Sequence, residues 1–412
     1  AMDSGILVGS GQTQAELSTG IPESLQDSLM TRLDRLSTKR EIVQVAAAIG
    51  RVFERRLLSE VLNWNDDDIS SALDQLIDNE LIVPVGQPGG EDAYRFRHAL
   101  VQDAAYQSML RSTASAWHGK IAAAIEASHK ETVVREPEIL GHHYWRAGDY
   151  TAAEGKLMTA ARQALEHSAN VEAISHLKHA LECLQKSPPS QERDRREIDL
   201  QIMIAVPLAF VRGYAHDSVL SAYARAQALC REYGETERLF KVVYGQFRSN
   251  MLGGEYVASK QNADRLVALC EDLSSPLALV STERSHGALQ TYLGHPFEAL
   301  NHLDKGIGLN LSIEHRFVGL DYDVVDLAVA LHGYRALSSW LAGDQSRARE
   351  AIDAALVHAE ETSHPFSQSF AHAFLGWISQ FQGDTAAVQD SSAKLIALSE
   401  EYSFQFWRGW AR

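Results

Sequence analysis

Few residues in this chain have the types and spacing of catalytic groups. The segment Gly9-Ser10-Gly11-Gln12-Thr13 has the glycines of a phosphate-binding loop. It lacks the Gly-Lys-Ser/Thr ending that brings a lysine to a bound phosphate. The sequence contains neither an HExxH zinc motif nor a GxSxG nucleophile motif, and it offers no evident pairing of a nucleophile with a base. We therefore expect a non-catalytic protein that needs no cofactor, with an unrecognised enzyme as a remote alternative.

One group of residues has a spacing that metal ligands can adopt. Glu138, His142 and His143 lie about one helical turn apart, so a metal site is conceivable there. The alternative is a packing position beside Tyr144 and Trp145, and the sequence favours this alternative because buried histidines are commoner than isolated ligands. We expect no metal.

An aromatic stripe is the clearest candidate for a ligand-facing surface. Phe370, Phe374, Trp377 and Phe381 follow each other at helical spacing, which places them on one helix face. A core position is the favoured interpretation, and a ligand-binding groove is the alternative. The same two interpretations apply to Tyr334 and Trp340.

Composition limits where such surfaces can act. The 412 residues are 45% hydrophobic and 22% charged, and a chain of this length should form several domains or a repeat array. Its formal net charge of −16 should repel nucleic acid and anionic membranes, so we expect no DNA or membrane partner. No apolar run approaches the roughly 18 residues of a membrane span. The three cysteines are far apart and predict buried thiols in a cytoplasmic protein.

The N-terminal part predicts a linker and then a winged-helix domain. Residues 1–20 are rich in Gly, Ser, Thr and Gln, and helical periodicity then alternates with two strand-like runs. Helices followed by a β-hairpin make a winged helix-turn-helix. We delimit this domain as residues 21–112. Its expected helices are 22–36, 39–51, 55–62, one capped by Asn65 or Asp66, and 99–111, and its strands are 81–85 and 93–98.

The helix that would enter a DNA groove is acidic. It carries Asp66, Asp67 and Asp68 in its first turn, followed by Asp74 and Asp78, and it contains no lysine or arginine. Since DNA affinity depends on neutralising phosphates, this helix should be repelled by DNA. A packing role is favoured, and a DNA-binding regulator remains the alternative.

From residue 113 to residue 412 the sequence predicts a solenoid of helical hairpins. Gly254 and Gly294 are 40 residues apart, Gly343 follows after 49 more, and Gly383 after another 40. A glycine can end one helix in the left-handed conformation, and a nearby Asp or Ser caps the next. Such a period indicates repeats related to tetratricopeptide units, with an enlarged loop near Leu309–Asp323.

Large side chains recur two residues before each of these glycines, and we expect them to fill the hairpin cores. They are Leu252, Tyr292, Leu341 and Phe381. The aromatic segment from Phe404 to Trp410 predicts the start of another helix. Because solenoids normally end in a polar capping repeat, we expect the array to be truncated at its C-terminus.

Three segments resemble STAND-class signalling ATPases of bacteria, including those linked to adenylate/guanylate cyclase or LuxR-type output domains. The segments are IPESLQDSLMTRLDRL (21–36), RFRHALVQDAAY (95–106) and SANVEAISHL (168–177). The fold class is therefore expected to be all-α: a small winged-helix domain with one β-hairpin, then a right-handed α-solenoid of tetratricopeptide-like hairpins.

The resemblance also implies partners and a site. The winged helix would pack on an upstream nucleotide-binding domain of the same protein, and the solenoid would bind an effector protein or a small ligand. His98, next to Arg97, matches a histidine that contacts the β-phosphate of ADP in related switches, although Ala99 stands where an aspartate is often found. An imidazole at a helix start can donate to a phosphate. A histidine satisfied locally is the alternative.

Overall fold

The chain is almost entirely helical in its computed structural model, which describes residues 40–85, 92–313 and 324–411. The linker expected over 1–20, the helix expected over 22–36 and most of the expected enlarged loop lie outside these residues. Within the described ranges no helix is both long and apolar enough for a membrane span. The chain forms two compact units, Ala1–Ala153 (unit 1) and Glu154–Arg412 (unit 2).

Unit 1 combines helices with one small antiparallel sheet in the order β1-β3-β2. Phe53 pairs with Tyr94, and Val83 pairs with Arg95. A helix, a strand, two helices and a hairpin follow one another, as in a winged helix-turn-helix. The elements are α2 (Arg40–Ile49), β1 (Val52–Glu54), α3 (Arg55–Leu62), α4 (Asp66–Asp78), β2 (Ile82–Pro84), β3 (Ala93–Phe96), α5 (Ala99–Gln107), α6 (Arg111–Ser128), α7 (Lys130–Arg135) and α8 (Pro137–Ala147).

Local signals explain most of these element ends. The side chain of Asn65 accepts a hydrogen bond from the Asp68 amide at 2.8 Å and caps α4, as the sequence predicted. Asn63 ends α3 in the left-handed conformation. Strand β1 was not predicted, because three residues are too short to show an alternating pattern.

Unit 1 has one apolar core, and this core extends beyond the predicted winged-helix domain. Trp117 and Ile121 of α6 and Leu140 of α8 pack into the same buried cluster as Leu58 and Phe96. The compact unit therefore runs to Ala153, because α6 packs on α2 and α3 and α8 packs on α6. The domain boundary placed at residue 112 stays a prediction about sequence modules.

Unit 2 is a row of antiparallel helical hairpins. Partners within a hairpin pack closely, as α11 does with α12 and α15 with α16. The helices are α9 (Tyr150–Glu166), α10 (Asn170–Lys186), α11 (Gln191–Arg212), α12 (Asp217–Tyr233), α13 (Thr236–Leu252), α14 (Tyr256–Leu273), α15 (Pro276–Tyr292), α16 (Pro296–Asn310), α17 (Leu327–Leu341), α18 (Gln345–Thr362), α19 (Pro365–Gln382), α20 (Thr385–Glu401) and α21 (Gln405–Trp410).

The hairpin turns have the chemistry that the sequence predicted. Gly343 and Gly383 take the left-handed conformation with φ of 85° and 72°. Asp344 then caps α18 by accepting from the Arg347 amide at 2.9 Å, and Asp384 caps α20 in the same way. Helix ends in this unit are therefore determined by a few adjacent residues.

The large residues before the glycines do not all fill hairpin cores, which corrects that expectation. The side chains of Leu341 and Phe381 are 48% and 49% exposed. They lie at the last turn of α17 and of α19, where the chain leaves the helix layer. Close packing depends instead on helix glycines. A Cβ on Gly245 would lie 2.3 Å from the ring of Tyr223, and one on Gly333 would lie 2.7 Å from the ring of Phe370.

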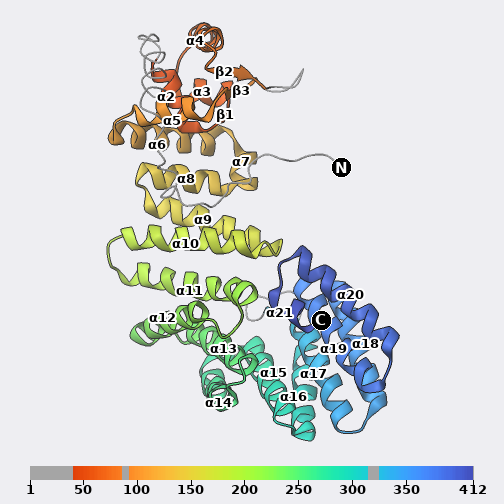
Figure 1. The fold of residues 1–412 in the computed structure, drawn as a ribbon. Coiled ribbons are helices and arrows are strands. Elements are labelled where there is room, and N and C mark those ends of the chain that lie inside the picture. The colour runs from red at the N-terminus through yellow and green to blue at the C-terminus, as the bar shows by residue number, and fades with distance from the viewer. Residues whose placement is uncertain (1–39, 86–91, 314–323, 412) are drawn as a thin grey trace. The chain divides into compact units, whose positions relative to one another are not determined.

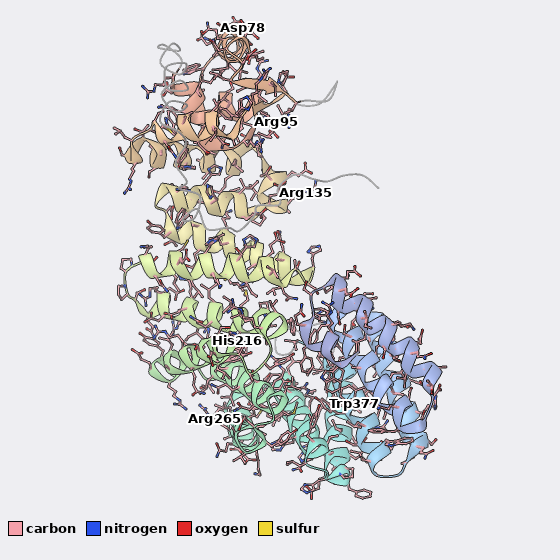
Figure 2. The ribbon with its side chains drawn as sticks, viewed as in Figure 1. Asp78, Arg95, Arg135, His216, Arg265 and Trp377 are labelled. Carbon is pink, nitrogen blue, oxygen red and sulfur yellow. The ribbon has the colours of Figure 1, made fainter. Side chains whose placement is uncertain are left out.

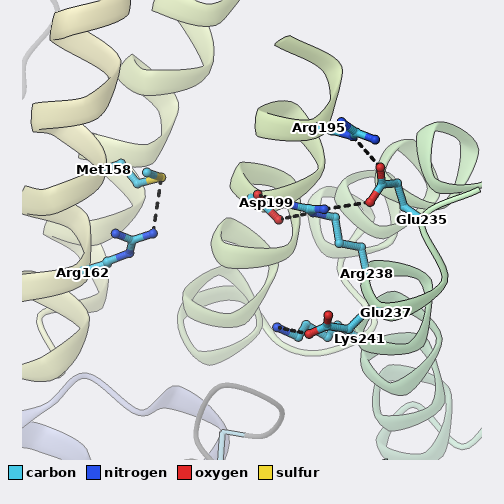
Figure 3. A network of polar contacts seen from close by, with 8 residues as sticks. All are labelled: Met158, Arg162, Arg195, Asp199, Glu235, Glu237, Arg238 and Lys241. Atoms are coloured by element: carbon cyan, nitrogen blue, oxygen red, sulfur yellow. Dashed lines mark hydrogen bonds and ion pairs between the residues drawn. The ribbon is translucent and has the colours of Figure 1, made fainter. Parts of the chain in front are cut away.

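An ion-pair network ties α11 to the junction between α12 and α13. Arg238 binds both carboxylate oxygens of Asp199, at 2.7 and 3.0 Å, and Glu235 accepts from Arg195 at 2.6 Å and from Arg238 at 2.8 Å (Figure 3). The hydrogen bonds to Asp199 are the largest cause of the raised pKa of Arg238. Networks and bidentate pairs of this kind stabilise more than isolated surface pairs do.

Candidate functional site

The odd-numbered helices from α11 to α21 form one continuous inner layer of unit 2. Helix α13 packs on α11 and on α15, α17 packs on α15 and on α19, and α21 packs on α19 (Figure 1). The even-numbered helices α12 to α20 each cover their own hairpin partner from the outside. Residues on the free face of the inner layer therefore face one another across the curve of unit 2.

A small aromatic cavity lies on this inner face. Its volume is about 20 Å³, and most of its lining is aromatic. The lining comes from four successive inner helices and from the segments before α12, before α17 and around α21. It comprises Tyr214, Arg248, Met251, Leu252, Arg284, Tyr292, Val324, Val325, Tyr334, Phe366, Phe370, Phe374, Phe406, Trp407 and Trp410.

Two buried arginines belong to the cavity wall. Arg248 is 3% exposed and Arg284 is 2% exposed. Arg248 donates to the Tyr223 hydroxyl at 3.3 Å, and Arg284 donates to the Tyr244 hydroxyl at 3.1 Å. The Arg284 guanidinium also lies over the ring of Tyr334, 5.6 Å from its centroid. Phenol hydroxyls and ring faces thus orient both cations within an apolar environment.

Burial changes the acid–base behaviour of the phenols in the wall. Desolvation, with a smaller contribution from Tyr334, raises the pKa of Tyr292 well above its ordinary value. Tyr292 therefore stays neutral at physiological pH and acts as a hydrogen-bonding group, while the arginines carry the local charge. The wall is suited to holding a ligand and shows no activated nucleophile among the described residues.

Sequence reasoning missed both arginines, although a signal for them was present. Phe240, Tyr244 and Arg248 are spaced by four residues, and so are Val280, Arg284 and Ala288. A cation that follows the spacing of buried neighbours lies on the buried helix face.

The predicted aromatic stripe divides between two surfaces. Phe370 and Phe374 are buried, as the core interpretation predicted, and they also line the cavity; the ligand-binding interpretation stays a prediction. Trp377, which Figure 2 labels on α19, is half-buried and packs against Trp410 with the rings tilted by 46° and their centroids 4.1 Å apart. Phe381 stacks instead on Trp340 at the exposed hairpin ends, with centroids 6.1 Å apart.

In unit 1 the two residues predicted to sense nucleotide are exposed. His98 is the N-cap residue of α5 and makes no side-chain capping bond there. Arg97 lies 3.5 Å from Glu80 in an exposed ion pair. The junction of β3 and α5 thus presents an imidazole at a helix start, a position suited to an anion. A role for His98 or Arg97 in nucleotide sensing stays a prediction.

The candidate metal group is not assembled. His142 is exposed and His143 is buried, and their ring centroids lie 5.8 Å and 5.1 Å from that of His118. His143 Nδ1 lies 2.8 Å from His118 Nδ1, and the Tyr106 hydroxyl lies 2.9 Å from His118 Nε2. Within the described ranges no three His, Cys, Asp or Glu side chains are placed to hold a metal ion.

Burial and neighbouring histidines keep this pair neutral. Desolvation, then the nearby His142, lowers the pKa of His118 to about 4. Desolvation, then His118, lowers the pKa of His143 to about 3. Neutral imidazoles can each donate and accept one hydrogen bond, so the row from Tyr106 to His143 is a packing element that joins α5, α6 and α8.

The acidic helix of unit 1 keeps its charges on the surface. Asp66, Asp67, Asp68, Asp74 and Asp78 are all exposed on α4, while Ile69 and Leu73 are buried on the other side. Figure 2 labels Asp78 on this helix and Arg95 on β3. Helix α4 therefore presents negative charge to the solvent where a DNA-reading helix would present positive charge.

Comparisons with known proteins support the fold. No family model matches the chain. A curated relative, an uncharacterized protein of Rhizobium meliloti (strain 1021), is 21% identical over 94% of this chain and only 38% of its own length. This chain therefore spans well under half of that relative.

Two solved structures are similar to the chain as a whole. One is a signal transduction ATPase with numerous domains (STAND) with a tetratricopeptide repeat sensor, from Pyrococcus horikoshii, with TM-score 0.50, 10% identity, and coverage of 89% of this chain and 51% of that one. The other is the apo form of RapI, with TM-score 0.53, 11% identity, and coverage of 92% and 99%. At such low identity the likeness concerns fold alone. The chain is an all-α protein whose larger part is a tetratricopeptide-like helical repeat solenoid.

Proposed function

We propose that this chain is the non-catalytic regulatory arm of a STAND-type signalling ATPase. Unit 2 binds an effector protein or a small ligand on its inner face, and unit 1 couples that binding to an upstream nucleotide-binding domain. The observation that carries the proposal is the inner-face cavity, in which Arg248 and Arg284 are held by phenols among aromatic side chains. The likeness to the Pyrococcus STAND protein, which spans 89% of this chain, supports the domain context.

The chemistry of the inner face indicates what it recognises. Rings such as those of Tyr334 and Phe370 offer large contact areas with little loss of side-chain entropy on binding. A guanidinium adds directional N–H donors that suit oxygen acceptors. We therefore expect an effector that presents apolar or aromatic groups together with hydrogen-bond acceptors.

A ligand screen tests this part of the proposal. Peptides of five to ten residues and aromatic carboxylates would be screened by the fluorescence of Trp407 and Trp410, which line the cavity. We expect a saturable response that Arg284→Met abolishes. Arg349→Met is the matched control, because Arg349 lies at the exposed hairpin ends, where it donates to Gln382. A screen without a saturable binder, or equal loss in both variants, would contradict the proposal.

DNA binding is the alternative function, and α4 argues against it. Its first turn carries Asp66, Asp67 and Asp68, all exposed, and phosphate neutralisation supplies most non-specific affinity. Fluorescence anisotropy with a labelled 30-base-pair duplex at low salt should show no binding. Salt-dependent association in the submicromolar range would favour a winged-helix regulator instead.

The nucleotide switch is proposed to lie outside this chain. Isothermal titration with ADP or ATP should therefore show no strong binding, and nanomolar affinity would overturn the assignment. In the full-length parent, His98 at the exposed start of α5 would contact bound ADP. His98→Ala should then speed ADP release from the parent, whereas His216→Ala, on the exposed start of α12 in unit 2, should leave the release rate unchanged.

A further inference from the structure

The inner layer of unit 2 makes one contact that a linear repeat array does not predict. In most solenoids each repeat touches only its neighbours. Here α11 also packs on α21, five hairpins later in the sequence (Figure 1). The contact is made by aromatic residues, which we call the aromatic seam: Phe210, Tyr214, Phe366, Phe404, Phe406 and Trp407.

Ring geometry shows that the seam is closed. Phe210 stacks on Phe366 with centroids 4.1 Å apart, and it meets Phe404 at 5.7 Å. Tyr214 meets Phe406 edge to face at 5.3 Å. Trp407 packs against Phe366 at 5.6 Å. Residues near the start of the row and residues near its end thus share one cluster.

The seam forms part of the wall of the cavity that the arginines line. Tyr214, Phe366, Phe406 and Trp407 are among its lining residues, as is Arg248 on α13. The cavity volume of about 20 Å³ holds about one water molecule. A ligand larger than a water molecule therefore fits there only if lining residues move apart.

The seam is held together by side chains. Each aromatic pair contributes only about 0.5–1.5 kcal/mol beyond the area it buries. No backbone hydrogen bond joins α11 to α21 in the described part of the chain. Loss of one ring contact should therefore weaken the seam without removing a backbone hydrogen bond.

We propose that the aromatic seam is a latch that controls access to the inner face of unit 2. In the closed state the seam excludes ligands. Binding at the inner face holds the seam open and changes the curvature of unit 2. This change in curvature is the signal that unit 2 passes to unit 1. This regulation rests on the proposed effector site, because the latch acts on that surface.

Hydrogen exchange measured by mass spectrometry on the whole chain without ligand tests the latch. The variants are Phe406→Ala, Phe210→Ala and the double variant. Phe406 is half-buried, so its variant should fold even if Phe210→Ala disturbs α11. We expect amides of α21 and of the last turn of α11 to exchange about tenfold faster, which corresponds to one or two lost ring contacts. Exchange in α14, α16 and α18 should not change.

Phe381→Ala is the control, because it removes the same side chain from the exposed stack on Trp340 and should leave the seam amides at their original rates. The latch is refuted if these amides keep wild-type rates in Phe406→Ala and in the double variant, or if all hairpins exchange faster together. The outcome is independent of the effector screen. A functioning latch without any inner-face ligand would contradict only the proposed function, and a ligand without a latch response would contradict only this inference.

Discussion

Unit 1 is organised around one apolar cluster, whereas unit 2 distributes its core over a row of hairpins. In unit 1, helices α2 to α8 and the three strands share buried residues such as Leu58 and Phe96. In unit 2 most packing joins a hairpin to its neighbours, whereas the aromatic seam joins distant hairpins. A single core favours all-or-none unfolding, whereas a repeat array tolerates local opening. A regulatory movement is therefore easier to build into unit 2.

The two units also bury polar groups differently. Unit 1 buries the neutral pair His118 and His143, which hydrogen-bond each other. Unit 2 buries the cations Arg248 and Arg284 beside its inner cavity. A neutral pair costs little to bury when its hydrogen bonds are made, whereas a buried cation costs more. The histidine pair of unit 1 is a packing element, and under the proposed function the arginines of unit 2 serve recognition.

The largest effect should come from the single core of unit 1. Phe96 is fully buried and packs against Phe53, with ring centroids 5.6 Å apart. Phe96→Ala should lower the free energy of unfolding of unit 1 by about 4 kcal/mol, through lost burial and a cavity. Urea unfolding followed by circular dichroism should then show an early transition for unit 1 and a later one for unit 2. A single shifted transition for the whole chain would contradict the comparison.

Helix packing within a hairpin should give the next largest effect. A Cβ on Gly245 would lie 2.3 Å from the Tyr223 ring, whereas one on Gly308 has open space. Gly245→Ala should destabilise unit 2 by roughly 2 kcal/mol through overpacking. Gly308→Ala should stabilise it by up to about 1 kcal/mol through helix propensity. Denaturant midpoints of the two variants measure the difference, and effects of the same sign would show that the packing is wrong.

Acid should destabilise unit 1 through its histidine pair. The folded-state pKa values of about 4 for His118 and about 3 for His143 lie below the unfolded value of 6.5. Unfolded unit 1 thus binds more protons, so the stability is fully present above pH 6.5 and is lost as the pH falls toward 3. We expect each of the two histidines to contribute a loss of about 2 kcal/mol between pH 7 and pH 5.

The variant His143→Gln removes one titrating group and keeps a hydrogen-bonding side chain. Its unfolding free energy should depend less steeply on pH than that of the original chain, measured by urea unfolding at pH 7, 6 and 5. Exposed His98, on the same unit, provides the control substitution His98→Gln. If both variants retain the original pH slope, the neutral buried pair is not its source.

Helix caps should give the smallest effect, and a similar one in both units. Asn65→Ala removes the bond to the Asp68 amide in unit 1, and Asp344→Ala removes the bond to the Arg347 amide in unit 2. Each loss should cost about 1 kcal/mol. Hydrogen exchange should then rise across unit 1 in the first variant but only near α18 in the second. Equally local effects would weaken the contrast between a single core and a repeat array.

The parts of the fold that the sequence predicted are those that depend on adjacent residues. Asn65 predicted the start of α4, and Gly343 with Asp344 predicted a hairpin turn. Both predictions were possible because a helix cap joins residues only three positions apart. Alternation at Ala93–Phe96 indicated a strand. The three residues of β1 gave no such signal, and their pairing with β3 spans about forty residues of chain.

The candidate site was predicted only in part for the same reason. Phe370 and Phe374 were recognised as one face of a helix, since helical spacing is visible in the sequence. The side chains that contact this face from other helices depend on the total rotation between successive hairpins. Arg248 and Arg284 meet Phe370 at one cavity only because several hairpins each add a rotation.

The sequence by itself determined the all-α class, the capped start of α4, the glycine turns of the hairpins and the acidic surface of α4, because each depends on the conformational preference or charge of neighbouring residues. It did not place every helix end: α5 ends at Gln107, although the sequence predicted a helix over 99–111. The tertiary structure alone decided that α21 meets α11 and closes the aromatic seam over the arginines. That contact depends on the small rotations between successive hairpins, which add up along the row. A local sequence pattern does not predict the accumulated rotation.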